Sequence, residues 1–309
     1  MGCWLKNSPL ILELVPPPLR LGPEGLEKRL RRLERIIGQI PLHGVNIPEI
    51  REEESKSDRG ERKTPFEPRV APRELARLVR RRFGLETIVN RVVVHRRAED
   101  QARWFRQTRA DYGIRNFVLV GGERNDVEYP GPTVAEANRL IREVLPEEGI
   151  EVGNICIPNR RAPPLDEPER MEEKATSGAR FFTTQITYHA SEFTALLDDL
   201  SERAPQASAT PILLSVCPLR SPQSVAFLHW LGVTLDEPLR ARLTAGGGSV
   251  LERSIEHLAG MWGRIQAHIE RRRIPTPVGV NIAPVGPIPA SAVVQLASRL
   301  QEHLSQPRG

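Results

Sequence analysis

The sequence predicts a (β/α)8 barrel, and three observations favour this α/β fold class. Short β-type runs alternate with amphipathic helical patterns along the whole chain. Eight such runs occur in 309 residues, a length within the range of these barrels. The Gly-rich turn of an open dinucleotide-binding sheet, G-x-G-x-x-G, follows none of these runs. The most similar segment, VGGERN (120–125) at the end of the fourth run, does not match this motif. We therefore expect residues 1–309 to form a single barrel domain.

The predicted strands are short apolar runs separated by helical patterns. They span residues 10–15, 43–47, 86–94, 116–122, 151–157, 180–187, 211–217 and 277–283.

The intervening segments have the periodicity of amphipathic helices. In residues 25–40, the side chains of Leu26, Leu30, Leu33 and Ile37 recur at three- and four-residue steps and make one apolar face. The same pattern recurs in residues 72–83, 98–113, 133–145, 191–203 and 291–304. One or two extra helices are expected between the seventh and eighth strands.

Capping signals mark several predicted helix ends. Thr133 and Ser191 are expected N-caps, and Glu136 follows Thr133 at the spacing of a capping box. Gly113 and Gly149 are expected to stop helices.

Composition narrows the function classes. The formal charge is +5, from 44 basic and 39 acidic residues, and the basic runs lie inside helical patterns such as LRRLER (30–35), which we interpret as solvated helix faces. No aromatic stacking pattern accompanies them, so nucleic-acid binding is not expected, whereas a small anionic substrate or cofactor would fit. No apolar run has the length of a membrane span, and the N-terminus does not read as a secretory signal.

The three cysteines are far apart, with no spacing typical of a zinc site. We expect a reduced, cytoplasmic protein without a metal centre.

The barrel prediction places the chemistry at the carboxyl ends of the strands, where active sites of this fold lie. The polar residues expected there are Glu13, Asn46, Glu49, Glu52, Asn90, Glu123, Arg124, Asn159, Gln185, Arg220 and Asn281. The charged loop at about 48–70 follows the second strand, and its composition fits either disorder or a lid over a substrate.

Four segments resemble the methylenetetrahydrofolate reductase family. Residues 171–188, MEEKATSGARFFTTQITY, match a family helix that ends in Lys, here Lys174, and leads through Gly-Ala to a strand closing in Thr-Gln, here Thr184 and Gln185. Glu13, shortly before Pro16-Pro17, is similar to the family's first strand.

Residues 112–123 are similar to the family's fourth strand, with Glu123 where Asp is usual, and residues 210–233 resemble its seventh strand and following helix. The resemblance covers nearly the whole chain at low identity. It implies a barrel that reduces 5,10-methylene-tetrahydrofolate, or a related tetrahydropterin, to the 5-methyl form.

The reaction implied by this resemblance needs a general acid, and we assign that role to Glu13. Leu12 and Leu14 flank Glu13 at the end of a predicted barrel strand, so partial desolvation favours its protonated form. The alternative is an exposed strand-end acid without a catalytic role. Glu49, after the second strand, either shares the acid role or is a single acid in a solvated loop.

Three residues are assigned to the substrate by the resemblance and their position. Gln185 has an amide that suits the donors and acceptors of a pterin edge, or bonds to a neighbouring loop instead. Glu123 binds a pterin amino group or sets the electrostatics of the iminium; the alternative is a salt bridge with Arg124 or a nearby helix. Asn281, at the end of the last strand, completes the set.

The resemblance implies NAD(P)H as the reductant and, in its usual members, bound FAD. Asn90, Lys174 and Arg161 are the residues expected to contact a cofactor. The family's flavin-binding motifs are replaced here by NIPEIREEE (46–54), Asn90 and IPNRRAPP (157–164). This is consistent with a flavin-independent branch that passes hydride directly from the nicotinamide. The alternative function is a non-catalytic or accessory pterin-binding barrel that needs a partner subunit for hydride delivery. A homo-oligomer or a complex with a partner subunit is expected.

Overall fold

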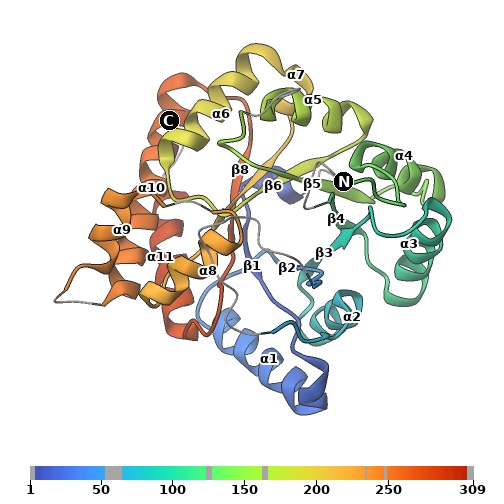
Figure 1. The fold of residues 1–309 in the computed structure, drawn as a ribbon, viewed down its shortest axis with the longest axis horizontal. Coiled ribbons are helices and arrows are strands. Elements are labelled where there is room, and N and C mark those ends of the chain that lie inside the picture. The colour runs from blue at the N-terminus through green and yellow to red at the C-terminus, as the bar shows by residue number, and fades with distance from the viewer. Residues whose placement is uncertain are drawn as a thin grey trace.

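A computed structural model describes residues 4–52, 65–122, 127–161, 166–233, 235–246 and 249–304. Eight parallel strands form a closed barrel in chain order, which confirms the predicted fold class (Figure 1). The strands are β1 (Leu10–Glu13), β2 (Gly44–Ile47), β3 (Glu86–Val92), β4 (Asn116–Val120), β5 (Glu151–Cys156), β6 (Phe181–Thr184), β7 (Ile212–Val216) and β8 (Val278–Ile282).

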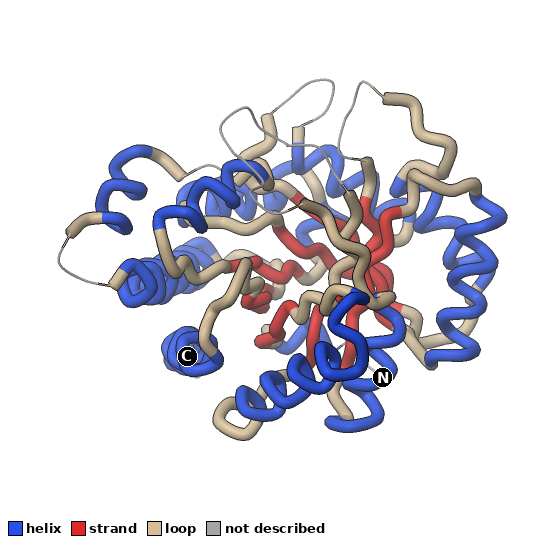
Figure 2. Tube along the Cα trace, turned by 60° about the horizontal axis from the view of Figure 1, so that its bottom comes forward, coloured by secondary structure: helices blue, strands red, loops and turns tan. Residues whose placement is uncertain are grey.

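Helices surround the barrel and cover the outer faces of its strands, as the ring of helices around the central strands in Figure 2 shows. They are α1 (Gly22–Ile37), α2 (Pro72–Phe83), α3 (Ala98–Tyr112), α4 (Val134–Val144), α5 (Glu167–Ser177), α6 (Ala190–Arg203), α7 (Pro205–Ser208), α8 (Pro222–Trp230), α9 (Glu237–Thr244), α10 (Val250–Arg272) and α11 (Ala290–Leu304). Two 3-10 turns, η1 (Trp4–Asn7) and η2 (Leu19–Leu21), precede β1 and α1.

Three helices, α8, α9 and α10, lie between β7 and β8, so the expected insertion at this point is present. No helix within the described ranges is both long and apolar enough to cross a bilayer.

Two of the four predicted helix ends are confirmed. Thr133 caps α4 through a capping box with Glu136, and Gly113 ends α3 with a φ of 68°. The other two are wrong. His189, rather than Ser191, is the N-cap of α6, so that Ser191 lies inside the helix, and α4 ends at Val144, five residues before Gly149.

The lower half of the barrel interior, toward the amino ends of the strands, is apolar. Ile11, Ile88, Phe181 and Leu213 pack there in one cluster with Leu5 from η1. Successive strand residues point to opposite faces, so these side chains occupy one inward layer. Because η1 contributes to the cluster, this end of the barrel is closed by packing.

Candidate functional site

The upper half of the interior, at the carboxyl ends of the strands, forms the floor of a cavity of about 800 Å³. Each strand supplies an inward residue to this floor, and Val92 of β3 and Thr184 of β6 line the cavity as well. The eight inward residues, here called the floor ring, are Glu13, Asn46, Asn90, Val120, Ile155, Thr183, Ser215 and Asn281. Some strands supply a residue to both the apolar cluster and the floor ring, and the floor residue then lies two positions later in the strand. In β1, for example, Ile11 belongs to the apolar cluster and Glu13 to the floor ring. The inward layer therefore changes from apolar to mostly polar within one strand repeat.

Glu13 lies between two asparagines supplied by the neighbouring strands. Its Cα pairs with Asn46 across β1 and β2, and Ile11 pairs with Asn281 across β1 and β8. Asn46 Nδ2 donates to Glu13 Oε2 at 3.1 Å. Burial raises the pKa of Glu13 from 4.5 to about 7, against the opposing effect of hydrogen bonds from Asn46 and Asn281. A large fraction of Glu13 therefore keeps its proton near neutral pH, as a general acid requires.

The two asparagines belong to the same tetrapeptide, Gly-Val-Asn-Ile, which forms β2 (Gly44–Ile47) and recurs in β8. The glycine that begins each motif lies against the backbone of a neighbouring segment, which leaves no room for a side chain. A Cβ at Gly44 would lie 2.8 Å from the carbonyl oxygen of Glu86, and one at Gly279 would lie 2.5 Å from that of Pro9. Sequence reasoning placed Asn46 among the strand-end residues but gave it no role. The repeated motif is the signal that would have paired it with Asn281.

Three floor-ring amides have an acceptor without a partner. Asn46, Asn90 and Asn281 are 3 %, 8 % and 1 % exposed. The Oδ1 atom of each is buried and accepts no hydrogen bond among the residues that the structure describes. A buried acceptor without a donor is costly. This arrangement therefore suits a ligand whose N–H groups enter the cavity.

Glu49 lines the cavity but is held by β3. Its Oε1 accepts from Arg91 Nη1 at 2.9 Å, and its Oε2 accepts from the backbone N–H of Val92 at 2.7 Å. Both carboxylate oxygens are engaged, so transfer of a proton through Glu49 would have to replace one of these bonds. Glu49 therefore ties the segment after β2 to β3 through these hydrogen bonds.

Gln185 lines the cavity and is bonded on both sides of its amide. Its Nε2 donates to the carbonyl of Leu231 at 3.2 Å, and its Oε1 accepts from the N–H of Ile186 at 2.9 Å. The structure thus shows the hydrogen bonding to a neighbouring loop that was the alternative to pterin binding.

The expected cofactor residues do not assemble around the cavity. Asn90 lines it, but Lys174 Nζ instead donates to the carbonyl of Ile155 at 2.8 Å and lies 3.7 Å from Glu167. Burial lowers the pKa of Lys174, and Glu167 opposes that effect. Arg161 pairs with Asp199 at 3.1 Å away from the cavity.

Of the three residues expected to contact a cofactor, only Asn90 lines the cavity. Glu123 and most of the charged loop at 48–70 lie outside the described residues.

One wall of the cavity carries positive charge that sequence reasoning did not assign to the site. Lys28, Arg29 and Arg32 of α1 line it, together with Arg69 from the segment before α2. The run 30–35 was interpreted as a solvated helix face. Arg32 departs from that interpretation because it is half-buried and faces the cavity.

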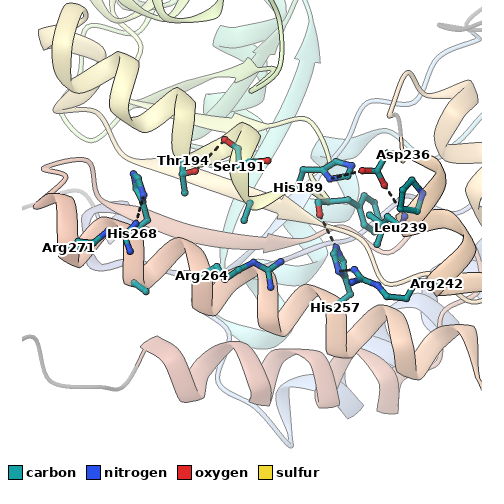
Figure 3. Close-up of a pocket in the computed structure, with 14 residues that line it drawn as sticks. His189, Ser191, Thr194, Asp236, Leu239, Arg242, His257, Arg264, His268 and Arg271 are labelled. Carbon is teal, nitrogen blue, oxygen red and sulfur yellow. Dashed lines mark hydrogen bonds and ion pairs between the residues drawn. The ribbon is translucent and has the colours of Figure 1, made fainter.

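A second cavity, of about 610 Å³, lies among α6, α9 and α10 (Figure 3). None of the residues predicted for the site lines it. Two of its arginines are hydrogen-bonded to its histidines, Arg242 to His257 Nδ1 at 2.8 Å and Arg271 to His268 Nδ1 at 3.2 Å. We therefore place the candidate site at the barrel mouth, around Glu13.

Comparison with known proteins supports the fold. No protein-family model matches the chain, and no curated protein matches it. Among solved structures, the chain is similar to an uncharacterized protein from Clostridium thermocellum that binds two copies of 5-methyl-5,6,7,8-tetrahydrofolic acid. The similarity covers 97 % of both chains, with a TM-score of 0.76 and 19 % sequence identity. At this identity the likeness establishes a shared barrel architecture over the length of the chain.

Proposed function

We propose that the cavity at the barrel mouth binds a reduced folate and that the protein reduces 5,10-methylene-tetrahydrofolate to the 5-methyl form. The observation that carries this proposal is Glu13, a partly buried acid with a pKa of about 7 between Asn46 and Asn281. The family resemblance of the sequence and the folate bound by the similar solved structure support the same ligand class.

Glu13 acts as the proton donor in this proposal. Its proton goes to a bridging amine nitrogen of the folate, the bond from that nitrogen to the methylene carbon breaks, and an iminium ion forms at the other nitrogen. Hydride from NAD(P)H adds to the methylene carbon and gives the methyl group, with NAD(P)⁺ as the oxidised product. Glu13 then takes a proton from solvent. A donor with a pKa near the working pH suits this step.

The floor ring binds and orients the pterin. The unpartnered oxygens of Asn46, Asn90 and Asn281 accept hydrogen bonds from its N–H and amino groups. Val120 and Ile155 form an apolar sector of the same ring against which a flat heterocycle packs.

We propose direct hydride transfer from the nicotinamide, without a flavin. FAD would supply an intermediate hydride carrier in the usual members of the family. The positions of Lys174 and Arg161 away from the cavity support a route that does not use it.

The test is NAD(P)H oxidation by the purified protein with methylene-tetrahydrofolate, with and without added FAD. We expect turnover without FAD and formation of 5-methyl-tetrahydrofolate. Folded protein that gives no turnover under any of these conditions would rule out the reductase. Turnover only with FAD would overturn the direct route.

A second candidate function is a folate-binding barrel that needs a partner subunit for hydride delivery. The engagement of Lys174 and Arg161 outside the cavity favours it, because two of the three residues expected to contact a cofactor are held elsewhere. Calorimetric binding of tetrahydrofolate without turnover would support this function, whereas steady-state turnover by the isolated chain would exclude it.

A further inference from the structure

Helix α1 packs one face against the core and turns another toward the cavity. Leu30, Leu33 and Ile36 are buried in the core. A second face, here called the cationic face, consists of Lys28, Arg29 and Arg32 and lines the cavity. Residues three and four positions apart lie on one side of a helix, so these three charges form a single stripe.

The cationic face adjoins an apolar wall. The segment 283–289 after β8 lines the cavity and contributes Val285 and Ile288. Arg32 Nη2 donates to the carbonyl of Ile288 at 2.6 Å, which joins α1 to this segment. Leu21, at the start of α1, also lines the cavity and is 43 % exposed, an apolar surface available to a ligand.

The cationic face has no carboxylate to neutralise it among the described residues. Lys28 and Arg29 form neither an ion pair nor a side-chain hydrogen bond with any described residue, although Arg31 of the same helix pairs with Glu27. Burial lowers the pKa of Arg29, and the nearby Arg69 guanidinium lowers it further. Burial likewise lowers the pKa of Arg32, with Arg29 and Arg35 adding to the effect. Like charges are thus held together beside a cavity, an arrangement that an anion would stabilise.

We propose that the cationic face binds the carboxylates of the glutamate tail of a reduced folate. This inference rests on the proposed function and extends it from the pterin to the other end of the ligand. The cavity presents polar acceptors around Glu13, an apolar wall, and cationic side chains that adjoin this wall through Arg32 and Ile288. A folate has three matching parts, a hydrogen-bonding pterin, an aryl ring and an anionic tail. Each further γ-linked glutamate adds a carboxylate, so affinity should rise with tail length.

The phosphates of a nicotinamide dinucleotide are the other anions that the cavity would meet. We assign the cationic face to carboxylates because the apolar wall of Val285, Ile288 and Leu21 borders it, and this wall matches the aryl ring that precedes the folate tail.

The experiment compares Arg29→Gln with Arg31→Gln as the matched control, since Arg31 lies on the same helix but is exposed and paired with Glu27. Calorimetry measures the affinity of each variant for 5-methyl-tetrahydrofolate, its tri-γ-glutamate form, a tetrahydropterin without a tail, and NADPH. A lost charge-assisted hydrogen bond should weaken folate binding by Arg29→Gln about tenfold. We expect a larger loss for the triglutamate, no change for the tailless pterin, and wild-type affinities in Arg31→Gln.

The other outcomes overturn the inference in distinguishable ways. Unchanged folate affinity in Arg29→Gln, or an equal loss for the tailless pterin, would refute the tail site while leaving the proposed function intact. Weaker NADPH binding with unchanged folate binding would assign the cationic face to phosphate. Wild-type protein that binds none of the tetrahydrofolates would refute both the proposed function and this inference.

Discussion

The two halves of the barrel interior differ in the side chains that line them. The lower half is an apolar plug that includes Leu5 from η1, Ile11 and Phe181. The upper half, nearer the carboxyl ends of the strands, carries Glu13, the three asparagines and two hydroxyls, with Val120 and Ile155 as its apolar members. Along a single strand, a step of two residues therefore separates a side chain that holds the barrel closed from one that is available for chemistry.

The largest expected effect on the upper half comes from Glu13→Gln. Glutamine keeps the size and hydrogen bonding of Glu13 but does not supply its proton. We expect turnover to fall about 10²–10⁴-fold, with folate affinity little changed, because the interaction is made mainly in the transition state. Parallel steady-state kinetics and calorimetry would measure this. A variant that keeps most of the wild-type rate would remove Glu13 from the acid role.

Substitutions in the lower half should change the stability of the protein instead of its turnover. Phe181 and Thr183 are inward residues of the same strand, β6, and both are buried. Phe181→Ala leaves a cavity in the apolar cluster and should lower the free energy of unfolding by about 3–5 kcal/mol. Thr183→Val removes a hydroxyl that shares a 3.3 Å hydrogen bond with Ser215 and should cost about 1 kcal/mol. Urea denaturation measures both, and equal losses would contradict the division into two halves.

The raised pKa of Glu13 has a stability cost of its own. It rises from 4.5 to about 7 in the folded protein, which corresponds to at most about 3 kcal/mol. Below pH 4.5 both states are protonated and the cost is absent. It grows as pH rises from 4.5 and is fully present above pH 7. Glu13→Gln should therefore be more stable than wild type at pH 8 and equally stable at pH 4. Denaturant unfolding at the two pH values provides the comparison, and a pH-independent difference would argue against a buried, protonated Glu13.

The smallest expected effect concerns Asn46. Its amide donates to Glu13 and opposes the rise in pKa. Asn46→Leu removes this donor, so the pKa of Glu13 should rise and the alkaline limb of the rate profile should move to higher pH. A shift to lower pH would contradict the geometry at Glu13. Asn154→Leu serves as a comparison on β5, because Asn154 pairs with Asn138 instead of lining the cavity.

Sequence patterns predicted the fold well because strand and helix periodicities are local. They also indicated Glu13 as a residue of the barrel mouth, since an acid within an apolar strand end is visible in the residues themselves, and Glu13 lines the cavity. The cationic face was missed because Arg29 and Arg32 look like any solvated helix charge until the closed barrel places α1 beside the cavity. Lys174 was assigned to a cofactor from a motif, yet Glu167 and the carbonyl of Ile155 hold its ammonium elsewhere. Such partners depend on tertiary packing, which no local pattern encodes.

The role of Glu13 as proton donor is tested most sharply by the pH dependence of kcat/KM for methylene-tetrahydrofolate reduction in wild type and Glu13→Gln, since this quantity reports the ionising groups of the free enzyme. We expect the wild-type rate to fall above a pKa of about 7, as Glu13 loses its proton, and the residual rate of the variant to lack that fall. Identical profiles in the two proteins would contradict the assignment of Glu13 as the proton donor.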